Sequence, residues 1–215
     1  GTLQFDAPIR SPAGGRMQFP ASRVSITVDG VAGTTDASGG FSFAGAGPAS
    51  VGVQVSGPLV RVLNLDVPGI STNLSVADAS AGIWSTAAEV RADAQLSAYV
   101  HASLVKAFAK SELAPSLAWL DEQLEVGANE TDLECNAYST GDSIHFFVET
   151  AECENTARIA DVIYHEFGHS LHAQSIVTGG GQFDIHLSEG VSDYLAATMT
   201  DDPKKKDLKG SLANP

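Results

Sequence analysis

The chain has 215 residues, of which 43% are hydrophobic and 18% charged, a balance typical of a folded globular protein rather than a disordered one. The formal net charge of −14 argues against a partner made of nucleic acid, because phosphate-binding surfaces need clustered lysine and arginine. The basic run Lys204–Lys206 is flanked by aspartates and is interpreted as a solvated loop. No signal peptide is recognised, and no apolar run approaches the ~20 residues of a transmembrane segment.

Residues 1–72 are predicted to form a small β-sandwich that acts as an accessory module. The stretch RVSITVDG alternates apolar and polar residues, which is the period of a half-buried strand, and Asp29-Gly30 then favours a tight hairpin turn. A second turn is expected at Gly39-Gly40, and it would send Phe41 and Phe43 to one face. Two further strands are expected in VGVQVSG and LVRVLNL.

Residues 73–215 are predicted to be α+β, because the hydrophobic period changes from about residue 84. The stretch STAAEVRADAQLSAYVHASLVKAFAKSE contains no Gly or Pro, and its apolar residues recur at helical spacing, so a long amphipathic helix is expected. His101 lies beside the apolar stripe and is interpreted as packed or solvated rather than as a ligand. NAYSTGDSIHFFVET predicts two strands with a turn at Gly141-Asp142. Two more helices are expected, over residues 156–176 and about 188–199.

The two cysteines, Cys135 and Cys153, flank the predicted hairpin. Their separation of eighteen positions is long for paired zinc ligands, and the chain has no second pair. A disulfide is favoured over free thiols, and it would stabilise the fold by roughly 3 kcal/mol in the chain-entropy model. Together with few lysines and many small polar residues, a disulfide indicates an exported protein, whether secreted, periplasmic or at the cell surface.

The stretch ADVIYHEFGHSLHAQ holds His165 and His169 four residues apart in a predicted helix. Residues i and i+4 share one face of a helix, so both imidazoles can reach a single metal ion. Glu166 can hold a water molecule whose pKa zinc lowers towards ~7, and can take its proton as a general base. The five-residue pattern also arises by chance, so further ligands have to come from the rest of the chain.

Glu189 and Asp193 extend this pattern. A His, His, Glu set leaves the fourth position of zinc open, as catalysis requires, and Glu189 begins a predicted helix beyond a glycine-rich loop. Asp193 lies one turn after Glu189 and could accept the spare N–H of a zinc-bound imidazole. SEGVSD also fits a helix start with Ser188 as the cap, and both interpretations can hold together. The metzincin pattern fails, because it needs Gly at 172 and His at 175 where this chain has His172 and Ser175.

HEFGH followed by SEGVSD resembles the thermolysin-like and fungalysin-like gluzincin metallopeptidases, over residues of about 85–200. The resemblance implies a zinc-dependent endopeptidase with one catalytic Zn²⁺ and a peptide or protein substrate. CNAYSTGDSIHFF resembles the edge strand of these enzymes, so Asn136 and Ala137 would bind the substrate backbone as an added strand. TDASGGFSF resembles the carboxypeptidase regulatory-like, transthyretin-like modules attached to many secreted enzymes.

The chain departs from the pattern of those peptidases. Gly180 stands where thermolysin-like enzymes have a tyrosine. Asp161 matches a calcium ligand, but Thr200 stands where its partner carboxylate belongs, so a structural Ca²⁺ is not expected. The sequence stops before the second lobe that would supply the oxyanion-stabilising histidine. We therefore expect an incomplete zinc lobe, whose active site is completed by a C-terminal companion segment or lobe.

A second interpretation belongs to another class of protein. The chain could be a zinc-stabilised binding or inhibitor module in which the HExxH lobe is catalytically idle. Glu166 distinguishes the endopeptidase from the non-catalytic module, because a purely structural zinc site has no need of a general base.

Overall fold

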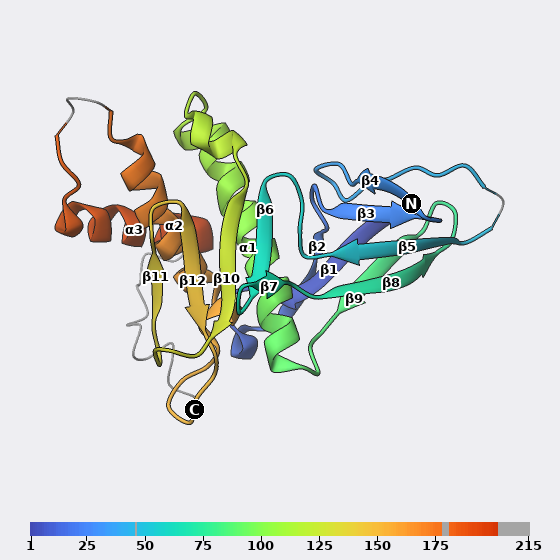
Figure 1. Cartoon of the computed structure of the whole chain (residues 1–215), viewed down its shortest axis with the longest axis horizontal. Coiled ribbons are helices and arrows are strands. Elements are labelled where there is room, and N and C mark those ends of the chain that lie inside the picture. Colours follow the sequence, from blue (N-terminus) through green and yellow to red (C-terminus); the bar gives the residue numbers. More distant parts are fainter. Residues whose placement is uncertain (46, 178–180, 202–215) are drawn as a thin grey trace.

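The computed structural model describes residues 1–45, 47–177 and 181–201. These residues form a mixed α+β fold in which N-terminal strands occupy one end, helices α2 and α3 occupy the other, and helix α1 lies between (Figure 1). The helices are α1 (Val90–Phe108), α2 (Ala160–Ser175) and α3 (Ile185–Thr200), with short helical turns η1 (Pro12–Gly14), η2 (Ala109–Leu113), η3 (Ala118–Asp121) and η4 (Thr156–Arg158). Among the described residues, no helix combines the length and hydropathy needed to cross a membrane.

The strands form three sheets. A three-stranded sheet has the order β2-β1-β9, and a four-stranded sheet has the order β4-β3-β5-β8. Their strands are β1 (Thr2–Pro8), β2 (Arg16–Pro20), β3 (Ser25–Val28), β4 (Val31–Thr34), β5 (Ala49–Gln54), β8 (Ser71–Val76) and β9 (Ala81–Ser85). The third sheet has the order β11-β12-β10-β6-β7, with β6 (Val60–Asn64), β7 (Val67–Pro68), β10 (Leu124–Glu130), β11 (Ala137–Ser139) and β12 (Ser143–Phe147).

The hairpin predicted at Asp29-Gly30 joins β3 to β4. Both turn residues have positive φ, 49° and 86°, which is what a tight two-residue turn between twisted strands requires. Val28 and Val31 pair across it. Phe41 and Phe43 lie on one side as predicted, with ring centroids 6.1 Å apart, although their segment is not a regular strand.

The sheets do not divide where the sequence pattern divides the chain. The strand in LVRVLNL was expected in the N-terminal sandwich, but it is β6 and runs parallel to β10 in the five-stranded sheet. Conversely, β8 and β9 lie almost wholly beyond residue 72 and belong to the N-terminal sheets. A single buried apolar cluster extends from β1 through α1 to α2. The boundary at residue 72 therefore cuts across both the sheets and the core.

Helix α1 is the central packing element, in contact with β1, β6, β10 and α2. His101 lies fully buried on it, which confirms the interpretation of this histidine as a packed residue. Its Nε2 is 2.9 Å from the carbonyl oxygen of Pro8, and its Nδ1 is 2.7 Å from the hydroxyl of Tyr164 on α2. Because the carbonyl can only accept, Nε2 carries the hydrogen and Nδ1 accepts from Tyr164.

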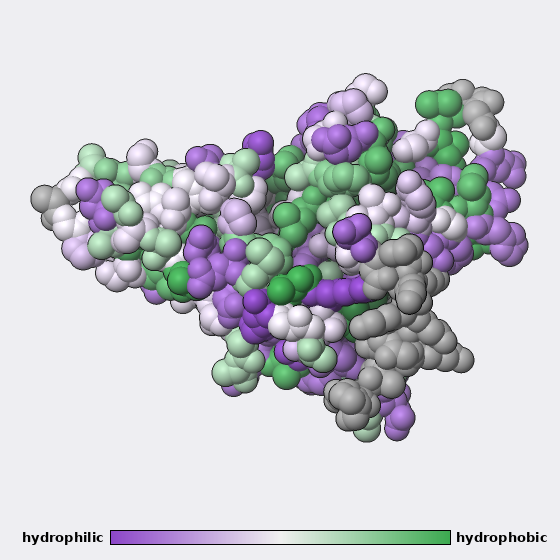
Figure 2. All heavy atoms as spheres, turned by 180° about the vertical axis from the view of Figure 1, so that it is seen from behind, coloured by the Kyte–Doolittle hydropathy of each residue, from purple (hydrophilic) through white to green (hydrophobic). Residues whose placement is uncertain are grey.

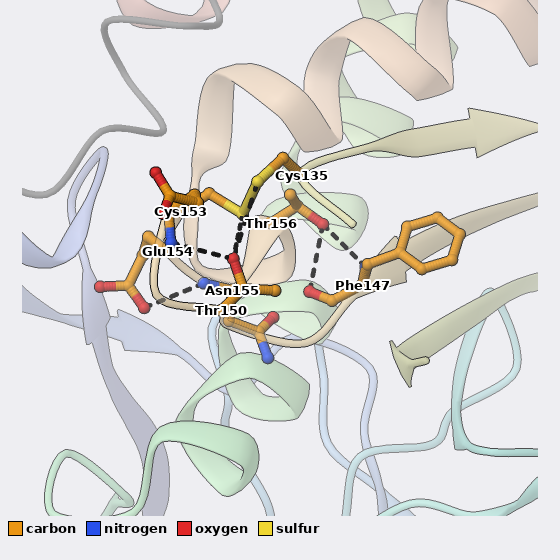
Figure 3. The surroundings of a disulfide bond; sticks show 8 residues. Cys135, Phe147, Thr150, Cys153, Glu154, Asn155 and Thr156 are labelled. Atoms are coloured by element: carbon orange, nitrogen blue, oxygen red, sulfur yellow. Dashed lines mark hydrogen bonds between the residues drawn. A yellow bond between two sulfur atoms is a disulfide. The ribbon is translucent and has the colours of Figure 1, made fainter. Parts of the chain in front are cut away.

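The predicted hairpin after Asn136 consists of β11 and β12, and β11 is the outer strand of its sheet. The disulfide between Cys135 and Cys153 is formed as predicted, with a Cα–Cα distance of 5.6 Å. Figure 3 shows it beside Thr150, in the loop that leads to η4. The disulfide thus ties Cys135, two residues before the edge strand, to the segment that precedes α2.

Candidate metal centre

Helix α2 presents two different faces along its length. Ile163 and Phe167 are fully buried on the face towards the core, and the Phe167 ring lies 5.6 Å from that of Trp119. His165 and His169 occupy another face, and their Nε2 atoms are 3.1 Å apart. The i, i+4 spacing therefore brings the two imidazoles together as the sequence pattern predicts.

Helix α3 packs against α2 and brings Glu189 to the same point. One carboxylate oxygen of Glu189 is 3.3 Å from Nε2 of His165, and the other is 3.7 Å from Nε2 of His169. One ligand atom from each of the three side chains lies within 4.8 Å of the other two. The structure thus gathers the three residues predicted as ligands.

Gly168 permits the close approach of α2 and α3. This glycine was not singled out in the sequence analysis. A Cβ built on Gly168 would lie 2.5 Å from the Cα of Ser192 on α3. Any larger residue at this position would push the two helices apart. A glycine inside a helix costs about 1 kcal/mol relative to alanine, so its presence within HEFGH was the available signal of a packing requirement.

The other nitrogen of each imidazole also has a partner on α3. Nδ1 of His165 is 2.9 Å from a carboxylate oxygen of Asp193, and Nδ1 of His169 is 2.7 Å from the hydroxyl of Ser188. Ser188 was expected to cap the helix, but α3 begins earlier, and Asp184 is the cap that accepts a hydrogen bond from the backbone of Leu187. Ser188 is therefore free to contact His169.

The donor set fits a tetrahedral divalent cation. Nδ1 of His165 lies 2.9 Å from a carboxylate oxygen of Asp193, and with its hydrogen on that nitrogen His165 presents Nε2 as a lone-pair donor. The two Nε2 atoms share a hydrogen bond of 3.1 Å, and a cation that replaces the shared hydrogen would meet an imidazole lone pair from each residue. Ligand atoms around tetrahedral zinc are separated by roughly 3.3 Å, given Zn–N bonds of ~2.0–2.1 Å. The 3.1 Å between the two Nε2 atoms and the 3.3 Å from Nε2 of His165 to one oxygen of Glu189 are close to that spacing.

Glu166 is buried beside these ligands, with 7% of its surface exposed. Burial, together with the negative charge of Glu189, raises the pKa of its carboxyl group to about 8. Burial also lowers the pKa of His169, together with the nearby His165. Both shifts describe the metal-free chain, and both reflect charged groups crowded in a site of low solvent access.

A groove of about 610 Å³ runs between the edge strand and the two helices. His165, Glu166, His169 and Glu189 line one side of it, and Asn136 and Ala137, with the rest of β11, line the other. Apolar side chains extend the groove at Ala173, Ile176, Phe183 and Ile185. The residues predicted to bind substrate are thus brought to the same groove as the predicted catalytic and metal-binding residues.

Contacts with α2 hold the edge hairpin in place across the groove. The hydroxyls of Ser139 and Ser170 are 2.8 Å apart, and the side chain of Gln174 donates to the carbonyl of Gly141 at 3.2 Å. On β11 itself, the ring of Tyr138 stacks on His145 of β12 with centroids 4.5 Å apart. The strand that lines the groove is therefore held from both sides.

Asp161, which matches a calcium ligand of the resembling enzymes, contacts Arg10 instead. Two nitrogens of the Arg10 guanidinium lie 2.6 to 2.9 Å from the Asp161 carboxylate. An arginine thus supplies the positive charge at this carboxylate. Gly180 and the run Lys204–Lys206 lie outside the described residues.

The comparisons with known proteins give little beyond the fold. No model of a known protein family matches the chain, and no curated protein sequence matches it. Among solved structures, the chain is similar to the precursor of protealysin, a metalloproteinase from Serratia proteamaculans, with a TM-score of 0.48 and 14% sequence identity. The match covers 66% of this chain and 43% of that structure, so the chain spans less than half the length of the protein it resembles.

Proposed function

We propose that this chain is the zinc-bearing part of a zinc-dependent endopeptidase of the gluzincin type. The observation that carries the proposal is the convergence of His165, His169 and Glu189 on one point, with the buried carboxyl group of Glu166 beside them in the groove. A metal held by these three ligands keeps a coordination position free, as in catalytic zinc sites. A purely structural zinc site would have a fourth protein ligand instead.

Zinc bound there would polarise the peptide carbonyl and acidify a water molecule to a pKa of ~7. Glu166 is the general base in this proposal: its carboxylate takes a proton from the attacking water and returns it to the departing amine. Burial suits it to this task, since a low-dielectric site raises the proton affinity of a carboxylate. Asp193 and Ser188 hold the two imidazoles in fixed orientations through their Nδ1 atoms.

A peptide substrate would bind along β11. This strand is at the edge of its sheet, so an extended peptide can add to it through backbone hydrogen bonds. Asn136 and Ala137 would contact the substrate backbone next to the metal ligands, because they line the same groove. This placement puts a peptide bond of the substrate close to Glu166.

We also propose that a companion segment or lobe completes the groove on the side of α3. Leu187 and Tyr194 expose 59% and 74% of their surfaces on this helix, and Phe183 and Ile185, just before and at its start, are about half exposed. Phe183 and Ile185 line the groove itself, and exposed apolar residues of this kind are typical of an interaction surface. The companion would supply the donors that stabilise the oxyanion, which are typically worth ~10² to 10³ in rate. The chain alone is therefore expected to cleave slowly.

The disulfide between Cys135 and Cys153 favours an oxidising compartment, so we propose that the protein acts outside the cytosol, in secreted, periplasmic or surface-bound form.

Cleavage of an unstructured protein substrate by Glu166→Gln tests the proposal. This variant should retain one zinc ion per chain but lose at least about 10² in rate, because the general base is gone. Glu112→Gln removes an exposed carboxylate elsewhere and should behave as wild type. A chelator should stop cleavage by the wild type, and added zinc should restore it.

Two results would contradict the proposal. Equal cleavage by wild type and Glu166→Gln would remove the general base from the mechanism. Zinc bound by the wild type without any zinc-dependent cleavage would favour the non-catalytic binding module instead.

A further inference from the structure

We propose that the segment from Pro8 to Arg10, at the end of β1, positions the metal centre by fixing the first turn of α2. Through that turn the N-terminal strands would set the affinity of His165, His169 and Glu189 for a divalent cation. The site is that of the proposed function, but the inference concerns metal affinity and can be measured without peptide cleavage.

Arg10 holds the start of α2 through both its backbone and its side chain. Its carbonyl oxygen accepts a hydrogen bond of 2.8 Å from the backbone N–H of Ala160, the first residue of the helix. Its guanidinium binds the carboxylate of the next residue, Asp161, through Nε and an η nitrogen. A paired arginine and carboxylate in this geometry constrain direction as well as distance. The first turn of α2 is therefore fixed by a residue 151 positions away in sequence.

Pro8 reaches the next turn of α2 through His101. The Pro8 carbonyl accepts from Nε2 of His101 at 2.9 Å, and Nδ1 of His101 accepts from the Tyr164 hydroxyl at 2.7 Å. His101 is fully buried and Tyr164 is 4% exposed, so water does not compete for these bonds. Arg10 directly, and Pro8 through His101, thus hold the N-terminal part of α2 at Ala160, Asp161 and Tyr164.

These contacts bear directly on the ligands. Asp161 is one helical turn before His165, and Tyr164 is the residue before it. An α-helix moves as a rigid rod with a rise of 1.5 Å per residue, so a shift of its first turn displaces the imidazoles. Metal ligands have to be held within about 0.5 Å of the productive geometry. Glu189 is on a different helix, so movement of α2 alone changes the separation of the ligands.

The Arg10 guanidinium also supplies a positive charge at the carboxylate of Asp161. Asp161 keeps only 21% of its side chain exposed, and the guanidinium covers it. We therefore expect the zinc affinity of the chain to be the same with and without added calcium.

The zinc affinity of Arg10→Gln tests the inference. Dissociation constants are measured at pH 7.5 by competition with a chromophoric chelator, on protein whose folding is checked by circular dichroism. We expect Arg10→Gln to bind zinc about tenfold more weakly, the effect typical of residues that orient metal ligands. Arg61→Gln, which breaks the exposed pair of Arg61 with Glu125 away from α2, should bind as wild type. The exchange Arg10→Asp with Asp161→Arg should recover most of the loss.

Each outcome separates the inference from the alternatives. An unchanged zinc affinity in Arg10→Gln, with a lower melting temperature, would show that the pair only stabilises the fold and would overturn the inference. If Arg10→Gln does not fold, Asp161→Asn provides the same comparison. No zinc binding by the wild type would overturn the inference together with the proposed function. Weaker binding by Arg10→Gln supports the inference even if no variant cleaves peptide.

Discussion

Helices α1 and α3 both pack against α2, but they do so by different means. Twelve of the 19 residues of α1 are buried, whereas in α3 only Ser188, Ser192 and Leu195 of 16 residues are buried. The contact between α1 and α2 is thus part of the apolar core, whereas α3 adds Leu195 to that core and otherwise meets α2 through polar groups and the predicted metal ligands. Apolar burial contributes most of the favourable free energy of folding, and the candidate metal centre lies beside a helix that buries few apolar side chains.

The surface reflects the same contrast. In Figure 2 the end formed by the N-terminal sheets has mostly intermediate hydropathy, while strongly hydrophobic and strongly hydrophilic patches adjoin at the end that carries α2 and α3. The candidate metal centre lies at the second end. The following variants separate the stabilising interface of α2 from its metal-binding interface.

Phe167→Ala should have the largest effect on stability. Phe167 is fully buried against Trp119, and removing a buried aromatic ring costs ~3–5 kcal/mol of unfolding free energy. Phe183→Ala is the matched control at the α3 end, where the ring is 47% exposed, and it should cost less than about 1 kcal/mol. Urea unfolding of the two variants measures the difference. Equal losses of unfolding free energy in the two variants would mean that the core side of α2 and the α3 end contribute alike to stability, which would contradict the contrast between them.

His101→Gln should change the pH dependence of stability. Burial lowers the pKa of His101 to about 4, below the ordinary value of 6.5. As pH falls from 6.5 to 4, the unfolded chain takes up a proton that the folded chain excludes, so stability falls by at most about 3 kcal/mol. Glutamine can donate to Pro8 and accept from Tyr164 but does not titrate. The variant should therefore lose less stability over this range.

Melting temperatures between pH 4 and 7 provide the measurement for His101→Gln. His186→Gln, an exposed position on α3, is the control and should keep the slope of the wild type. If His101→Gln retained the full slope of the wild type, His101 would not be the group responsible for it.

Asp193→Asn should have the smallest effect on folding and a selective effect on metal binding. The variant keeps the shape of the side chain that lies 2.9 Å from Nδ1 of His165, but the negative charge that strengthens the ligand is lost. We expect zinc affinity to fall 10- to 100-fold, roughly 1.4–2.8 kcal/mol, while the unfolding free energy of the metal-free chain stays within about 0.5 kcal/mol. Asp78→Asn, in an exposed turn, should change neither quantity. Unaltered zinc affinity in Asp193→Asn would remove Asp193 from the metal centre.

Features that depend on neighbouring residues could be predicted from the sequence. The turn at Asp29-Gly30, the helix of His165 and His169, and the edge hairpin all follow from short patterns of turn residues and hydrophobic period. The arrangement of His165 and His169 on one face needs nothing more than helical geometry. Glu189 comes to the same point from a separate helix, and the motif spacing was the signal for it.

Features that depend on distant partners could not be predicted. The strand β6 has the same alternation whether it joins the N-terminal sheets or pairs with β10, so its sheet was wrongly predicted. Strand β10 itself was missed, because LEVGANE contains Gly127 and Asn129, residue types that are depleted in strands. The contact of Arg10 with Asp161 joins positions 151 residues apart, and no local pattern marks either residue for it.

The most direct test of the metal centre is the anomalous scattering of crystals of this chain soaked in zinc and measured at the zinc absorption edge. We expect one strong peak, ~2.0–2.2 Å from Nε2 of His165, Nε2 of His169 and a carboxylate oxygen of Glu189, with an open position facing the groove. A peak bound by other residues, or no peak in crystals that contain zinc in solution, would contradict the assignment of these three residues as the ligands.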